Sequence, residues 1–147
     1  MILALRSTIR HPLYPDLPAT PAVRSKGRCI ALAGTFSELV EAATAGAHPR
    51  RAVFVLAYAD QAFLDDSQRD ELWHRFQVPV FALLLDRDRR LLGYECEVQH
   101  GLHLSASASF AEAHAGILKS TPCDCGRPGP RLLPDSGKPL AMALCAF

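Results

Sequence analysis

The sequence predicts an α/β fold in which a small parallel β-α-β-α-β sheet is followed by a β-hairpin and a cysteine-containing knuckle. Apolar runs of strand length lie at residues 29–34, 52–59 and 78–86, and segments of helical length separate them. A charged turn and a group of cysteine and histidine residues follow the third run. Strands that alternate with helices at this spacing pair in parallel through right-handed crossovers.

The size and composition fit one globular domain. The chain has 147 residues, of which 49% are hydrophobic and 21% are charged, as in an ordinary folded domain. Sixteen basic and fifteen acidic residues give a net charge of +1. A balance this close to neutral does not indicate nucleic acid or a membrane surface as a partner, so we expect neither.

The first fifteen residues do not resemble a secretory signal. Their short apolar run is interrupted by Arg6 and Arg10, and it lacks the order of basic, apolar and small-residue segments. No run in the chain reaches the roughly 18 apolar residues of a membrane span. We therefore expect a cytoplasmic protein, in which clustered cysteines bind metal or do redox chemistry.

Residues 1–28 are predicted to form an N-terminal strand and a proline-rich surface arm, and residues 29–147 a single α/β domain. Prolines recur through 11–28 without apolar periodicity. After the first strand of the body, Thr35 and Glu38 have the spacing of a capping box, which predicts a helix from there to about Ala45, ended by Gly46.

A second helix is predicted over 66–76, with Leu72, Trp73 and Phe76 on its buried face. The charged residues 86–90 and the strand-like run 91–98 then indicate a hairpin.

Two later segments are less regular. Residues 104–110 alternate as a strand does, but Ser109 and Glu112 form another capping-box pattern, which predicts a short helix over 110–118. The apolar run 140–147 predicts an edge strand.

Four residues in two turns have the pattern of a closed structural zinc site. Cys96 and His103 are separated by six residues, while Cys123 and Cys125 lie in a turn rich in proline and glycine. Thiolate and imidazole ligands favour tetrahedral Zn²⁺ over magnesium or calcium. Gly126 allows the backbone to fold back so that both sulfurs of the C-x-C pair reach one ion. The sequence therefore predicts a zinc-knuckle region formed by 94–134.

Several alternatives remain for individual residues of this region. His100 competes with His103 as the fourth ligand. Taken alone, a cysteine such as Cys96 is more commonly a buried apolar residue in a strand, and a histidine such as His103 an ordinary polar residue. Cys29 and Cys145 lie in apolar runs and are predicted to be packed core residues.

The charged residues near the knuckle also have two interpretations. Asp86, Asp88 and Glu95 suggest a site for a hard metal, but the arginines between them favour a solvated hairpin tip. Arg127 and Arg131 have the chemistry to bind a phosphate or carboxylate, and the simpler expectation is that they cover the turn and pair with nearby acids.

Two segments resemble a known family. YECEVQHGLHL (94–104) and CDCGRPGPRLLP (123–134) are similar to the corresponding segments of phenylacetate–coenzyme A ligase-like, adenylate-forming enzymes. Residues 65–86 resemble the helix and strand that lead into them, so the similarity covers roughly 50–134. The resemblance implies a structural zinc at the positions matched by Cys96, His103, Cys123 and Cys125.

The chain departs from that family where the family does its chemistry. It has no glycine-rich phosphate loop, and Leu84 to Asp88 stand where the family carries an aromatic-Gly-x-Thr-Glu motif. Lys138 lies in no context that matches the family's catalytic lysine. We expect the zinc-bearing subdomain without adenylation activity.

Three classes of function follow from these residues. The favoured one is a non-catalytic zinc-binding module that binds a protein partner, such as a carrier protein or a larger enzyme subunit. The second is a small zinc-dependent hydrolase that uses His100 and Glu97, which requires an open position on the metal. The third is a redox or zinc sensor based on the C-x-C thiols. The sequence contains no nucleophile elbow, H-E-x-x-H motif or G-x-G-x-x-G motif.

Overall fold

The computed structural model describes residues 10–58, 63–86, 88–99, 101–104, 116–119, 123–127 and 131–134. The chain divides into two compact units. The first unit comprises Met1–Leu56 and Asp66–Phe81, and the second comprises Ala57–Asp65 and Ala82–Phe147. The α/β class predicted from the sequence is confirmed. The range 29–147, predicted to be a single domain, contains residues of both units.

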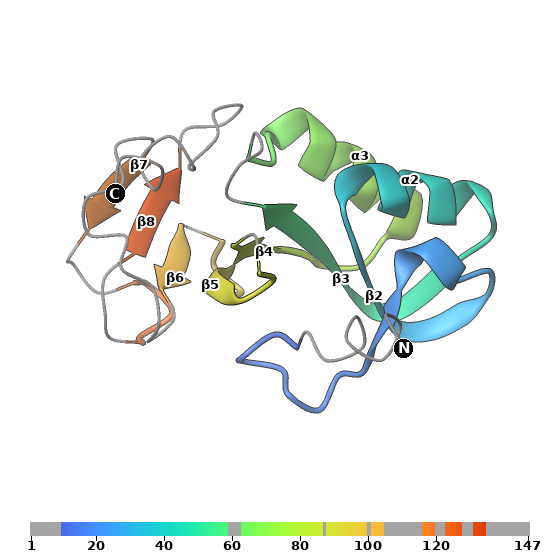
Figure 1. Ribbon diagram of the computed structural model, residues 1–147, viewed down its shortest axis with the longest axis horizontal. Coiled ribbons are helices and arrows are strands. Elements are labelled where there is room, and N and C mark those ends of the chain that lie inside the picture. The colour runs from blue at the N-terminus through green and yellow to red at the C-terminus, as the bar shows by residue number, and fades with distance from the viewer. Residues whose placement is uncertain are drawn as a thin grey trace. The chain divides into compact units, whose positions relative to one another are not determined.

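The sheet of the first unit is parallel. Its strands are β1 (Ala19–Pro21), β2 (Arg28–Gly34) and β3 (His48–Tyr58), in the order β1-β2-β3 (Figure 1). The strands predicted at 29–34 and 52–59 are therefore present, although β3 begins earlier, at His48. Residues Ala52 to Ala57 of β3 are all buried, as expected of a strand covered on both faces.

Helix α2 (Phe36–Thr44) begins at the predicted capping box. The Glu38 N–H donates to Thr35 Oγ1 at 3.3 Å, and the Thr35 N–H donates to Glu38 Oε1 at 2.9 Å. These two bonds satisfy amide groups that have no partner within the helix. The chain leaves the helix through Gly46, whose φ of +94° is in the left-handed region that glycine tolerates.

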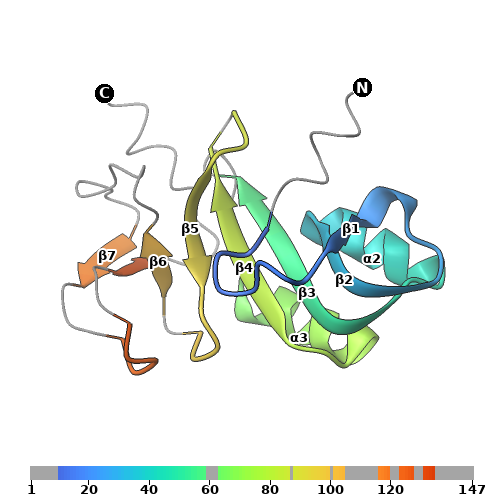
Figure 2. The same cartoon turned by 90° about the horizontal axis from the view of Figure 1, so that it is seen from below.

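Helix α3 (Asp66–Phe76) packs beside α2 on one face of the sheet (Figures 1 and 2). Leu72 and Phe76 are buried, but Trp73 is 46% exposed, so its predicted place on the buried face is wrong. Residues four apart share a helix face, whereas Trp73 is turned by about 100° from Leu72.

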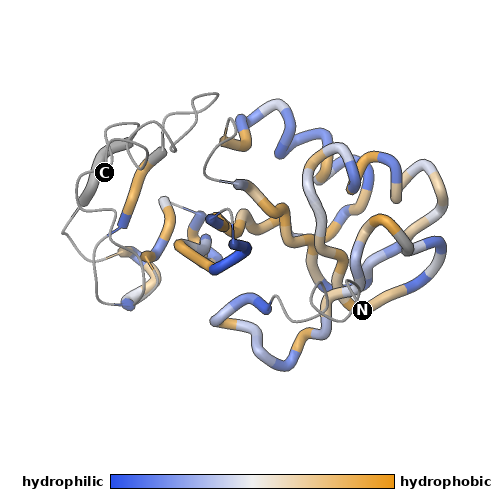
Figure 3. Tube along the Cα trace, in the orientation of Figure 1, coloured by the Kyte–Doolittle hydropathy of each residue, from blue (hydrophilic) through white to orange (hydrophobic). Residues whose placement is uncertain are grey.

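The hydropathy of these elements follows their burial, because β3 is hydrophobic over most of its length and α3 is largely hydrophilic (Figure 3). Among the helices of the described segments, none combines the length and the apolar character needed to cross a membrane.

The segment before β2 is packed against the first unit. It contains β1, which is an edge strand of the sheet, and the short 3-10 helix η1 (Ala22–Arg24), which contacts α2. The residues ahead of β1 cross the face of the sheet opposite the two helices (Figure 2). His11 is fully buried there, with ring centroids 4.9 Å from Tyr14, 5.5 Å from Phe54 and 5.4 Å from Phe81. The expectation of a surface arm therefore does not describe His11, which an aromatic cluster holds in place, although neighbouring residues such as Pro12 and Asp16 are exposed as expected.

The sheet of the second unit is antiparallel. Its strands follow the order β4-β5-β6-β8-β7, and their bounds are Val80–Leu85, Leu91–Glu95, Leu102–Leu104, Arg131–Pro134 and Gly116–Lys119. The pairing of β4 with β5 agrees with the predicted hairpin. At its turn, Asp86 accepts a bond from the Arg90 N–H at 2.8 Å, so this carboxylate serves the turn.

Strand β7 replaces part of a predicted helix. The helix expected over 110–118 is wrong at its C-terminal end, because Gly116–Lys119 pairs antiparallel with β8. The rest of that range lies outside the described residues, as do the strands expected at the N-terminus and over 140–147.

Candidate metal centre

Cys96 and His103 are placed by two paired strands of the second unit. Cys96 follows the end of β5, and His103 is the middle residue of β6, opposite Tyr94. Alternate residues of a strand point to the same face, so Cys96 lies on the face of Tyr94 and His103. The Gln99 N–H donates to the Cys96 carbonyl at 3.0 Å and closes the turn between the strands.

Gly101 completes this turn at a position where no other residue fits. Its φ is +94°, and a Cβ there would lie 2.6 Å from Leu133 Cδ2 and 3.0 Å from the Leu132 carbonyl oxygen. Strand β8 therefore passes directly against the turn that follows Cys96.

Cys123 and Cys125 lie in a tight turn of their own. The Gly126 N–H donates to the Cys123 carbonyl at 2.9 Å, and Gly126 has a φ of +88°. The left-handed glycine folds the chain back immediately after Cys125, as the sequence predicts.

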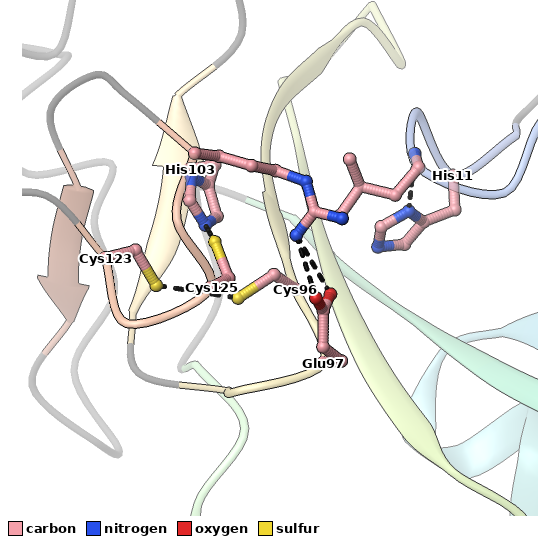
Figure 4. Close-up of polar contacts among 8 residues, drawn as sticks. His11, Cys96, Glu97, His103, Cys123 and Cys125 are labelled. Atoms are coloured by element: carbon pink, nitrogen blue, oxygen red, sulfur yellow. Dashed lines mark hydrogen bonds and ion pairs between the residues drawn. The ribbon is translucent and has the colours of Figure 1, made fainter.

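The structure brings the four predicted ligands together. One ligand atom from each residue lies within 4.8 Å of all the others. The Sγ atoms of Cys96 and Cys123 are 3.7 Å apart, and Cys125 Sγ is 3.5 Å from His103 Nε2 (Figure 4). Cys96, His103 and Cys123 are buried, and Cys125 is half-buried. Three sulfurs and one imidazole nitrogen form a donor set that can hold a metal ion.

The surroundings of His103 orient its ring and favour its neutral form. The Tyr94 ring stacks on it at a centroid distance of 5.5 Å and an interplanar angle of 19°. Burial lowers the pKa of His103, and the positive charges of Arg127 and Arg131 lower this pKa further. Neutral imidazole is the form that binds metal.

The thiols of the cluster differ in acidity. Burial raises the pKa of Cys96 to about 11. Desolvation acts in the same direction on Cys125, but hydrogen bonds from the backbone and side chain of Arg127 outweigh it and lower the pKa of Cys125. A bound metal ion displaces the thiol protons, so these values describe the centre before metal binds.

An ion pair lies beside the cluster. Arg127 Nη1 is 3.0 Å from both carboxylate oxygens of Glu97 (Figure 4). The expectation that Arg127 pairs with a nearby acid is confirmed. The sequence did not lead us to expect that Tyr94 stacks on His103. The available signal was the two-residue spacing of Tyr94 and Cys96, which places both side chains on the same face of a strand.

The remaining candidates lie elsewhere or outside the described residues. Cys29 is in β2 of the first unit, where Ser25 Oγ is 3.9 Å from its sulfur and burial raises its pKa. Glu95 is buried and accepts a bond from the Ala82 N–H at 2.6 Å. Among the described residues, the cysteine and histidine cluster is the one group with metal-binding geometry. His100 and Cys145 fall outside the described segments.

No protein-family model matches this chain. A search of the curated proteins finds no match either. The resemblance to phenylacetate–coenzyme A ligases therefore stays a prediction, and the functional conclusions below rest on the geometry of the centre.

Proposed function

We propose that the protein is a non-catalytic module that binds one structural Zn²⁺ through Cys96, His103, Cys123 and Cys125. The observation that carries this proposal is that the four ligand atoms lie within 4.8 Å of one another although they come from two separate segments, the end of β5 with β6 and the turn of Cys123 and Cys125.

Two separations within the cluster match those of a tetrahedral zinc ion. Zinc bonds of about 2.3 Å to sulfur and about 2.0 Å to nitrogen place two sulfurs about 3.8 Å apart and a sulfur and a nitrogen about 3.5 Å apart. The measured separations are 3.7 Å between Cys96 and Cys123 and 3.5 Å between Cys125 and His103. Soft sulfur donors with one imidazole also favour zinc over magnesium or calcium.

Four protein ligands favour a structural role over catalysis. A catalytic zinc keeps one position for water or substrate, whereas a closed set of four ligands does not. Glu97, the general base considered for a hydrolase, is held by Arg127. In the proposed arrangement, zinc ties the turn after β5 to the turn before β8, as a zinc knuckle that follows a β-α-β-α-β body.

Metal content tests the site directly. We expect protein purified without added metal to contain one zinc per chain, and we expect Cys96→Ser and Cys125→Ser each to lose it. Cys29→Ser is the matched control, because Cys29 is a half-buried thiol of the first unit outside the cluster. Wild-type protein without metal, or zinc retained in both cluster variants, contradicts the proposal.

The proposed module does not activate carboxylic acids. Acyl-adenylate formation needs a cradle for the triphosphate and preorganised donors for the developing charge, and the sequence has neither the phosphate loop nor the aromatic-Gly-x-Thr-Glu motif. We expect no release of pyrophosphate from ATP with aromatic or aliphatic acids. Acid-dependent release of pyrophosphate that is abolished by a substitution within 84–88 contradicts this expectation and means that the protein is an enzyme.

The proposed partner is a carrier protein or a larger enzyme subunit in the cytoplasm. The support is that a closed zinc site stabilises a surface without supplying a reaction. Affinity purification with the wild-type chain and with Cys96→Ser tests it. A partner that binds only the zinc-loaded chain supports this role.

A further inference from the structure

We propose that Arg127 is a positioning residue of the metal centre, which joins the two ligand-bearing turns through Glu97 and offsets the negative charge of the zinc-bound thiolates. This inference rests on the proposed function, and it assigns the retention of the metal to a residue outside the four ligands.

The first support is where the pair lies. Glu97 directly follows Cys96 in the turn after β5, and Arg127 lies two residues after Cys125 in the other turn. The guanidinium nitrogen Nη1 is 3.0 Å from each carboxylate oxygen of Glu97. The ion pair therefore links the same two turns that the metal links.

The second support is a contact between Arg127 and a ligand. The Arg127 side chain lies close enough to the sulfur of Cys125 to lower the pKa of that thiol, in addition to its bonds with Glu97. A guanidinium has five N–H groups and can serve both acceptors. Cys125 is the most exposed of the four ligands, so its sulfur is the one that protons and competing chelators reach first.

The third support is the charge of the centre. Three thiolates, one neutral imidazole and Zn²⁺ carry a net charge of −1, in a site where three of the four ligands are buried. Arg127 supplies a positive charge at Cys125, while Glu97 holds the guanidinium in place. Removing a positive charge from beside a partly buried anion is costly, because water compensates it poorly there.

An ordinary surface ion pair offers a matched control. Arg75 and Glu71 in α3 are 3.2 Å apart, with side chains 36% and 45% exposed. Arg127 and Glu97 are 38% and 49% exposed. Exposed pairs of this kind contribute little to stability, so any difference between the two arginines must come from the metal centre.

The experiment measures how fast the zinc-loaded, full-length chain transfers its metal to an excess of a chromogenic chelator. We expect Arg127→Gln to release zinc about 10- to 100-fold faster than wild type, as when hydrogen-bond partners of metal ligands are removed. Arg127→Lys keeps the positive charge but not the planar guanidinium group, so we expect its rate of zinc release to lie between those of wild type and Arg127→Gln. We expect Glu97→Gln to accelerate zinc release less than Arg127→Gln does. We expect Arg75→Gln to release zinc at the wild-type rate.

A spectroscopic measurement separates positioning from general stability. In the cobalt-substituted protein, the sulfur-to-cobalt charge-transfer band reports the electron density on the thiolates. We expect this band to shift in Arg127→Gln, which loses the positive charge beside Cys125 Sγ, and not in Arg75→Gln.

The outcomes distinguish this inference from the proposed function. Wild-type protein without zinc overturns the proposed function. One zinc in wild type, with Arg127→Gln equal to Arg75→Gln in release rate and cobalt spectrum, overturns the role of Arg127 alone. If Arg127→Gln does not fold, the other two variants decide, and wild-type release rates in both Arg127→Lys and Glu97→Gln overturn the inference.

Discussion

The two units are stabilised by different kinds of interior. The first unit buries aromatic and aliphatic side chains such as Phe54 and Leu39. It also buries the polar residues His11, which accepts a bond from the nearby Leu13 N–H, and Ser25. The second unit also buries leucines, but it adds two cysteines, a histidine, Glu95 and Arg131. Buried polar groups cost free energy unless they have partners. From this comparison we expect the first unit to depend on its packing alone, whereas the second depends also on the proposed metal ion.

Removal of the metal is the strongest test of this difference. Structural zinc contributes about 10–16 kcal/mol in small zinc-binding peptides, and the proposed ion joins two segments of the second unit. We expect a chelator to abolish amide protection in β5, β6 and β8 while α2 and β2 keep theirs. Hydrogen exchange measured by mass spectrometry, with and without chelator, reports both units at once. Equal loss of protection in the two units means that they do not differ in this way.

A core substitution in the first unit tests the converse. Leu72 is fully buried, so Leu72→Ala is expected to lower the free energy of unfolding by about 2–5 kcal/mol. The control is Trp73→Ala at the next position, where the side chain is 46% exposed and the expected loss is much smaller. Denaturant titration gives the stability, and zinc analysis of the folded protein is expected to show full occupancy in both variants. Zinc loss from Leu72→Ala means that the site depends on the first unit.

Leu72 and Trp73 also show which features of α3 sequence periodicity can predict. The apolar positions of α3 identified the helix and its buried residues Leu72 and Phe76, because both lie four residues apart on one face. The same pattern misplaced Trp73, since a large apolar residue at the edge of a face is not distinguished from one at its centre. Strand β7 was missed because the local capping pattern of Ser109 and Glu112 does not encode the pairing of 116–119 with β8.

The candidate site divides in the same way. Its four ligands were predictable because cysteine and histidine in two turns are rare outside metal sites. The stacking of Tyr94 on His103 depends on the register of β5 with β6, and the Glu97–Arg127 pair joins residues thirty positions apart. Contacts of this range are fixed by tertiary structure, and the sequence indicated only that Arg127 would pair with some acid.

A smaller effect is expected at Glu95 in the second unit. This carboxylate is 4% exposed, and its Oε1 accepts a bond from the Ala82 N–H at 2.6 Å. Glu95→Ala leaves that amide without its acceptor, so we expect a loss of about 1–3 kcal/mol in unfolding free energy. Glu95→Gln retains an oxygen acceptor and is expected to lose less. Both are measured by urea denaturation of the zinc-loaded protein, and equal stability of the two variants contradicts a role for this bond.

The smallest effect is expected at the start of α2 in the first unit. Thr35→Ala removes the hydroxyl that accepts the Glu38 N–H, and loss of such a cap typically costs about 1 kcal/mol. The matched control is Thr44→Ala in the last turn of the same helix, because the exposed Thr44 hydroxyl only donates to the Val40 carbonyl, which is already part of the helix. Thermal and urea denaturation of the two variants compare the contributions.

The zinc release rate sharpens this last comparison. A cap in the first unit has no contact with the ligands, so Thr35→Ala is expected to destabilise the chain slightly and to release zinc at the wild-type rate. Arg127→Gln in the second unit is expected to do the opposite, with fast release and little loss of overall stability, because its ion pair is exposed. If Thr35→Ala accelerates zinc release as much as Arg127→Gln does, then release follows unfolding of the whole chain, and the two units do not have separate sources of stability.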